Sequence, residues 1–199
     1  MEKSSLQALN DLTIASLLTR FQISKVNGEK SLRIPITTNK IPLFKDYIDI
    51  HKLSNYVDLK ENEKVFEIKS SIMLEQKLKD WTKNGEVVSI NPSDLRISTF
   101  LLWVSLFTRK DGNYIGLETT LNQSLQETLI WIFKSLIDNC PIASSGSKFH
   151  FQSYLQLYLL SVKHHRAYVE TAELYWLLSE KEKRRLRQIV TDEEGVAYL

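Results

Sequence analysis

The chain alternates between two hydrophobic periodicities, and this alternation constrains its fold more than any other feature. Apolar side chains recur at helical spacing within residues 5–19, whereas Leu32, Ile34 and Ile36 alternate as along a half-buried strand. Asn27-Gly28, which precedes the alternating run, accepts the positive φ angles of a tight hairpin turn. The mixture predicts an α/β fold in which a mixed sheet is flanked by helices.

The same patterns predict the remaining elements. Strands are expected at residues 21–26, 29–36, 65–68, 114–118 and 140–143, and helices at 71–84, 91–108, 121–137, 149–165, 170–178 and 179–190. Residues 37–62 contain Pro42 and many polar side chains and are predicted to be irregular. Pro35 has no amide donor, which places its strand at a sheet edge. Residues 196–199 resemble the beginning of a strand, and no internal repeat or low-complexity tract is visible.

The helix predicted at 149–165 has the most regular pattern. Its Phe151, Leu155, Leu159 and Val162 are spaced for one buried face. We therefore expect truncation of Leu155 or Leu159 to destabilise the protein.

Composition narrows the classes of partner. The chain has 199 residues, 43% of them hydrophobic, so one domain is the default. Its formal net charge of +2 creates no overall field that favours nucleic acid, a membrane or a strongly acidic partner. The single cysteine, Cys140, excludes an internal disulfide and a thiolate zinc cluster, and we expect it to be a buried, inert thiol.

Targeting signals are not evident. The N-terminal run at residues 6–21 is broken by Asn10, Asp11 and Arg20, which is unlike a signal peptide. The longest apolar stretch, residues 100–107, is too short to span a bilayer. These patterns predict a soluble, cytoplasmic protein.

Two clusters could carry chemistry. His164 and His165 are neighbours on a predicted helix, so their side chains would point about 100° apart. This geometry does not favour binding of one metal ion by both, and we interpret them as histidines at a helix end, near the negative end of the helix dipole. Residues 181–187 hold five basic side chains, interleaved with Glu182. We interpret them as a solvated helix face because no aromatic platform lies beside them. The sequence therefore predicts no catalytic, cofactor-binding or metal-binding residue and no cofactor.

From residue 65 onward, the order of the segments is similar to a known family. The matching segments are Phe66-Glu67-Ile68, residues 74–81, 98–103, 109–112, 114–116, 136–143, 164–170 and 177–186. In this order they resemble the C-terminal lobe of a nonribosomal peptide synthetase condensation domain, within the chloramphenicol-acetyltransferase-like fold. The resemblance covers roughly two thirds of the chain. Residues 177–186 resemble the linker that opens an adenylation domain.

The resemblance implies a domain organisation and partners. Residues 1–45 would form an N-terminal helix and hairpin, 46–178 the condensation-like lobe, and 179–199 a linker helix with the start of a following domain. The partner would be an adenylation domain or a carrier domain that brings its own phosphopantetheine, with no nucleic acid and no membrane.

The departures from the family bear on activity. The family's acyl-transfer histidine belongs to an H-H-x-x-x-D-G motif, whereas Val169 and Glu170 stand where that motif has Asp and Gly. Residue 143 is alanine where the family has an arginine. The resemblance thus implies a partial, non-catalytic lobe that packs against adenylation or carrier domains. One alternative is an acyltransferase half that a separate N-terminal lobe completes, and another is an unrelated intracellular or viral scaffold or interaction protein.

Overall fold

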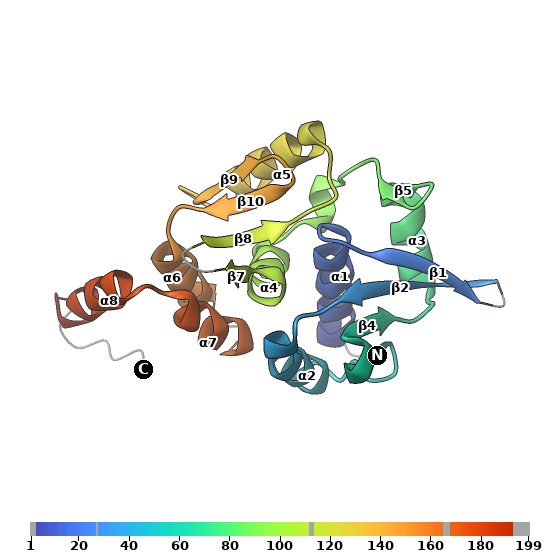
Figure 1. The fold of residues 1–199 in the computed structure, drawn as a ribbon, viewed down its shortest axis with the longest axis horizontal. Helices are drawn as coiled ribbons and strands as arrows, with labels where there is room; N and C mark the ends of the chain where they lie inside the picture. Colours follow the sequence, from blue (N-terminus) through green and yellow to red (C-terminus); the bar gives the residue numbers. More distant parts are fainter. Residues whose placement is uncertain (1–2, 27, 112–113, 165–167, 193–199) are drawn as a thin grey trace.

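A computed structural model of the chain describes residues 3–26, 28–111, 114–164 and 168–192 (Figure 1). His165 and the predicted strand at 196–199 lie outside these ranges. The described residues form helices and antiparallel sheets, so the broad α/β prediction is confirmed.

The first part of the chain forms one structural unit. Its elements are α1 (Lys3–Leu17), β1 (Gln22–Val26), β2 (Glu29–Pro35), the 3₁₀ turn η1 (Thr38–Lys40), α2 (Ile41–Ile50), β3 (Val57–Lys60), η2 (Glu61–Glu63), β4 (Val65–Ile68) and α3 (Ile72–Trp81). The four strands lie in the order β1-β2-β4-β3, and each neighbouring pair is antiparallel.

A second unit follows a short connection made of β5 (Thr82–Lys83), β6 (Glu86–Val87) and η3 (Pro92–Asp94). Its elements are α4 (Ile97–Phe107), β7 (Arg109–Asp111), β8 (Tyr114–Glu118), α5 (Gln123–Leu136), β9 (Ile142–Ser145), β10 (Lys148–Phe151) and α6 (Tyr154–His164). The strand order is β7-β8-β10-β9, again antiparallel throughout. Two further helices, α7 (Tyr168–Leu177) and α8 (Glu180–Asp192), complete the described chain.

The two units repeat one plan: a helix, a hairpin, a helix, a second hairpin and a closing helix, with corresponding strand orders. Two short segments repeat in sequence as well. Residues 16–20 read Ser-Leu-Leu-Thr-Arg and residues 105–109 read Ser-Leu-Phe-Thr-Arg, while Thr37-Thr38 corresponds to Thr119-Thr120. The expectation that the chain has no internal repeat is therefore wrong, because the repeat lies mainly in the order of the elements.

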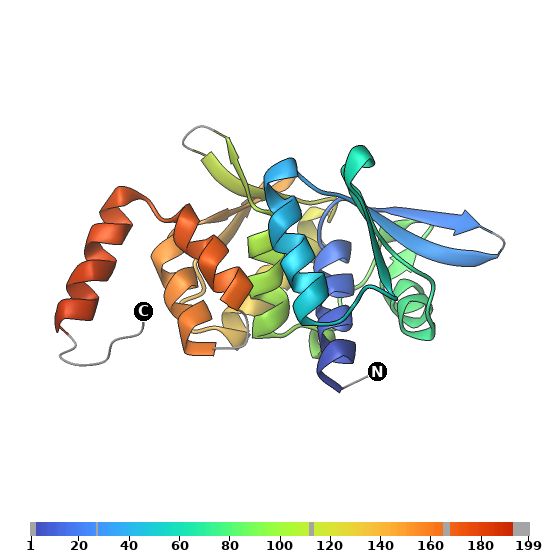
Figure 2. The same cartoon turned by 90° about the horizontal axis from the view of Figure 1, so that it is seen from below.

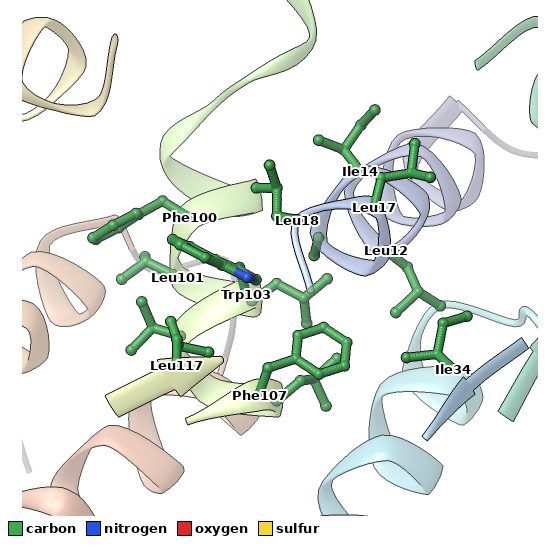
Figure 3. Close-up of a cluster of buried hydrophobic side chains, with 14 of the residues drawn as sticks. Leu12, Ile14, Leu17, Leu18, Ile34, Phe100, Leu101, Trp103, Phe107 and Leu117 are labelled. Atoms are coloured by element: carbon green, nitrogen blue, oxygen red, sulfur yellow. The ribbon is translucent and has the colours of Figure 1, made fainter. Parts of the chain in front are cut away.

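The first helices of the two units, α1 and α4, lie side by side at the centre of the molecule (Figures 1 and 2). Near the start of α4, the Ser98 and Thr99 hydroxyls donate to the Asp11 carboxylate at 2.8 and 2.6 Å. Farther along the two helices the contact is apolar, and Figure 3 shows Leu18 between α1 and the aromatic side chains Trp103 and Phe107. The two units thus share one core.

Two sequence-based predictions about the sheets need correction. We expected one mixed sheet, but every described strand pair is antiparallel, in two separate four-stranded sheets and one two-stranded ribbon. Pro35 does not mark an edge strand, because β2 lies between β1 and β4; β1 pairs only as far as Arg33, so Pro35 lies beyond its end. The expected division at residue 45 falls inside α2, and the first sheet contains strands from both sides of it.

Three segment predictions also differ from the structure. The helix expected at 91–108 is divided into η3 and α4, which begins only at Ile97. Residues 37–62 contain α2, whose buried Phe44, Tyr47 and Ile48 are at helical spacing, with Pro42 in the first turn, where a missing amide is tolerated. The helix predicted at 149–165 begins only at Tyr154. Residues 148–151 form β10, because Phe149 and Phe151 alternate inward and pair with β9.

Candidate binding groove between the two units

The repeated Ser-Leu-x-Thr-Arg segments bring two arginines to equivalent positions. Each segment covers the end of a central helix, so that Arg20 follows α1 and Arg109 follows α4 as the first residue of β7. The Thr108 hydroxyl donates a hydrogen bond to the Val104 carbonyl in the last turn of α4. The arginine side chains then extend away from the packed core, with exposed fractions of 61% and 47%.

Threonine side chains hold the two units together at this point. The Thr119 hydroxyl donates to the Leu18 carbonyl at 2.9 Å, and the Thr19 hydroxyl donates to the Glu118 carbonyl at 3.3 Å. The Thr120 hydroxyl donates to the Thr19 carbonyl at 3.4 Å. These bonds from threonine hydroxyls to backbone carbonyls fix the end of α1 against the end of β8, and so set the position of Arg20 relative to the second unit.

A groove lies between the units at these helix ends. It is lined by Thr19, Arg20, Pro35, Ile36, Thr37, Leu106, Phe107, Arg109 and Glu118. A second hollow shares Arg20 and Pro35 with it and adds Phe21, Gln22, Arg33, Val65 and Thr120. We call this combined surface, with its guanidinium groups of Arg20, Arg33 and Arg109, the arginine groove.

The arginine groove carries more positive than negative charge. Among the described residues that line it, Glu118 is the one acidic residue, and its carboxylate lies 3.4 Å from Arg20 Nε and 3.6 Å from Arg109 Nη1. Arg33 pairs with Glu63, a neighbouring residue outside the lining, while its buried Nε has no hydrogen-bond partner among the described residues. Each guanidinium carries more donors than one shared carboxylate can accept, so the groove can donate to an anion.

The residues singled out from the sequence lie elsewhere. His164 is exposed at the end of α6, and its neighbour His165 lies outside the described residues. Cys140 is buried, as expected, and this burial raises the pKa of its thiol to about 11, so the thiolate is not formed at neutral pH. Among the described residues, no group of three or more His, Cys, Asp or Glu side chains could hold a metal ion.

The basic run at 181–187 has a neighbour that the sequence analysis missed. We interpreted these residues as a solvated face because no aromatic side chain stood beside them in sequence. In the structure, the Lys183 Nζ atom lies 5.7 Å from the centroid of the Tyr175 ring, and Tyr175 adjoins Trp176. An aromatic side chain therefore does lie beside the basic run, and the argument for a solvated face no longer applies.

The sequence analysis did not single out Arg20, Arg33 or Arg109. The signal that could have identified two of them is the repeated Ser-Leu-x-Thr-Arg segment at the ends of two apolar helices. Arg33 carries no such signal, because only the pairing of β1 with β2 places it beside Gln22.

No protein-family model matches the chain, and no curated protein matches it either. Within the described ranges, none of the helices combines the length and the apolar character needed to cross a membrane.

Proposed function

We propose that this chain is a DNA-binding protein that holds a duplex across the arginine groove and the sheets on either side. The observation that carries the proposal is the convergence of Arg20 and Arg109, two equivalent positions of a duplicated unit, on one groove with Arg33. A guanidinium group matches the geometry of a phosphate and can bind it through two parallel hydrogen bonds.

The outer faces of the sheets supply the polar groups that such a site needs. Leu32 and Ile34 of β2 are buried, so the alternate residues Ser31 and Arg33 face outward, together with their β1 partners Ser24 and Gln22. In the second sheet, the inward Phe149 places its neighbours Lys148 and His150 on the outer face. Amide, hydroxyl, imidazole and basic groups are the side chains that read base edges and phosphates.

The arrangement of the hairpins suits a duplex. In Figure 2 the yellow-green β7–β8 hairpin lies at the top of the view and the blue β1–β2 hairpin projects to the right, while most of α1 and α4 lies below them. A two-stranded antiparallel ribbon fits the major groove of B-DNA, whereas the deep, narrow major groove of duplex RNA does not admit one. The duplicated protein surface also matches the approximate two-fold symmetry of a duplex.

This proposal departs from the expectation of no nucleic-acid partner. That expectation used the net charge of the whole chain, which is only +2. Phosphate binding depends on the charges near the contact, because screening in physiological salt limits their reach to about 8 Å. The arginine groove is locally positive although the whole chain is almost neutral.

The test is a fluorescence-anisotropy titration of a labelled DNA duplex of about 25 base pairs at several salt concentrations. Replacing both equivalent arginines, Arg20→Gln with Arg109→Gln, should weaken binding at least tenfold near 0.1 M salt and reduce the salt slope by about 2. The matched control is Lys79→Gln with Lys83→Gln, which removes two exposed positive charges outside the groove and should have little effect. Equal losses in both double variants, or no binding by the wild type at low salt, would contradict the proposal.

A condensation-like lobe stays a second candidate function. The specific observation in its favour is the helix at 180–192, which begins at a Ser179–Glu182 capping box where the resemblance expects the linker to an adenylation domain. Against it, β4 belongs to the first sheet, so the matching segments are divided between two units. Binding of a carrier or adenylation domain, measured by calorimetry, would favour this candidate if the Arg20→Gln/Arg109→Gln variant bound it normally.

A further inference from the structure

The C-terminal helices bring aromatic side chains together at the surface. The ring centroids of Tyr158 and Tyr175 are 5.7 Å apart, and those of Tyr175 and Trp176 are 6.0 Å apart. Trp176 is 70% exposed and Tyr175 is 37% exposed, although large aromatic rings are usually covered. An exposed pair of aromatic rings provides flat faces on which another ring can stack.

Helix α8 adds positive charge beside these rings. Lys181, Arg184, Arg185 and Arg187 are all exposed, and the Lys183 Nζ atom lies 5.7 Å from the centroid of the Tyr175 ring. The apolar Leu186 and Ile189 pack against the hydrophobic core, so the basic side chains occupy the remaining faces of the helix. In Figure 2, α8 lies at one side of the molecule, beyond α7.

The two acidic residues at the start of α8 do little to neutralise these charges. Glu182 accepts hydrogen bonds from the amides of Tyr154 and Leu155 in α6 and from Ser179, so its carboxylate is turned toward α6. Glu180 pairs with Lys183 at 2.9 Å. Glu180 also interacts electrostatically with Arg187 and Arg184, but these two carboxylates are fewer than the five basic side chains of residues 181–187.

We propose that α7 and α8 form a second nucleic-acid site that binds a single strand. We call it the aromatic–basic platform and define it by Tyr175, Trp176, Lys181, Arg184 and Arg185. Bases stack on the two rings, and the basic side chains of α8 contact the phosphates. Single-strand sites in general combine stacking rings with a positively charged track for the backbone.

The chemistry of the platform favours a single strand over other polyanions. An acidic peptide would meet the charges of α8 but has no repeated flat ring for Trp176. A membrane surface would require an outward apolar face, whereas Leu186 and Ile189 of α8 face the protein. Paired bases in a duplex are stacked on one another, so their faces cannot reach Trp176 and Tyr175.

The test is a titration of the full chain with a labelled single-stranded oligonucleotide of about 12 nucleotides. Trp176→Ala should weaken binding about tenfold. Arg184→Gln with Arg185→Gln should weaken it and reduce the salt slope by between 1 and 2, or about 0.7 for each lost contact. Trp131→Ala, which removes another exposed tryptophan, from α5, is the matched control and should bind as the wild type does.

The outcomes separate this site from the arginine groove. The Arg20→Gln/Arg109→Gln variant should keep its single-strand affinity, and Trp176→Ala should keep its duplex affinity. Polyglutamate and anionic phospholipid vesicles serve as competitors. The proposal is overturned if the wild type does not bind the single strand at low salt, if Trp176→Ala binds it normally, or if either competitor displaces it as well as unlabelled oligonucleotide does. Thermal melts of each variant show whether a lost affinity reflects unfolding.

Discussion

The two units of the molecule share a strand order but differ in what fills them. The second unit is packed with aromatic rings: Trp103 lies 5.1 Å from Phe149 and 5.9 Å from Phe133, measured between ring centroids. In the first unit, the sheet buries mainly aliphatic side chains, among them Leu32, Ile34 and Ile68, beside the ring of Phe66, whose centroid lies 4.2 Å from that of Phe44. The Lys60–Glu67 ion pair joins β3 to β4, and Lys69, directly after β4, pairs with Asp58 of β3.

This difference shows that the fold depends on periodicity and turns more than on the identity of the core residues. Both units place an inward residue at every second strand position and turn tightly between paired strands. Cores tolerate extensive hydrophobic replacement when volume and pattern are kept. The two interiors could therefore diverge while the helix-end arginines stayed in equivalent places.

The largest expected effect tests the aromatic interior of the second unit. Trp103→Ala should lower the free energy of unfolding by about 4 kcal/mol, because a fully buried indole leaves a large cavity. Phe66→Ala, which removes a fully buried ring of the first unit, should cost about 3 kcal/mol. Urea melts of both variants should still show one transition, because α1 and α4 share a core. Two separated transitions would mean that the units unfold independently.

The next effect concerns an ion pair between the first unit and α7. Lys40 is almost fully buried and pairs with Glu173 of α7, and burial lowers the pKa of Lys40 although Glu173 opposes the shift. Glu173→Ala would leave a buried cation without its partner and should cost about 3 kcal/mol in a denaturant melt.

The control for this pair is the double replacement Lys40→Met with Glu173→Leu. Because it removes both charges and keeps apolar volume, its stability should lie close to that of the wild type. If Glu173→Ala alone were harmless, α7 would not hold the first unit through this contact.

The sequence predicted most elements because their patterns are local. Ser71 caps α3 and Asn122 caps α5 through side chains that their own sequence context provides. Residues 37–62 were expected to be irregular because of Pro42 and many polar side chains, yet they contain α2, since proline in a first turn is compatible with a helix. The helix expected at 149–165 exists as α6, but its start was misplaced because a short run such as residues 148–151 satisfies both periods. Only the pairing of this run with β8 and β9 decides for a strand.

The candidate sites were less predictable than the elements. The arginine groove requires Arg20, Arg33 and Arg109 to meet across a sheet and between two units, which no local pattern encodes. The aromatic–basic platform was missed for a related reason. Tyr175 and Lys183 lie on different helices, and the turn between α7 and α8 decides whether they meet.

A smaller effect compares the closing helices of the two units. In α3 the buried Leu74, Leu78 and Trp81 follow the predicted spacing, whereas in α6 the buried face includes Leu155 and Leu157 and leaves Leu159 37% exposed. Leu157→Ala should therefore cost about 2.5 kcal/mol, and Leu159→Ala under about 1 kcal/mol. Equal losses of stability for the two variants in urea melts would mean that Leu159 is buried, as the sequence pattern predicts.

The smallest effect concerns how these two helices begin. Ser71 lies directly before α3 and caps it by accepting a hydrogen bond from Leu74. The first amides of α6 instead donate to Glu182 of another helix, α8, at 3.0 and 3.1 Å. Burial alone would raise the pKa of Glu182, yet the hydrogen bonds from Ser179, Leu155 and Tyr154 outweigh it and lower that pKa below 4.5. Because the folded state favours the carboxylate, this contribution is fully present above about pH 4.5 and is lost as pH falls through the lower folded-state pKa.

Glu182→Ala should cost about 1 kcal/mol at pH 7, and urea melts at decreasing pH should bring the variant and the wild type together. Ser71→Ala, which removes a hydroxyl cap, should cost a similar amount that does not change over this range. A Glu182→Ala deficit that stayed constant down to pH 3 would mean that α8 supports α6 by packing alone.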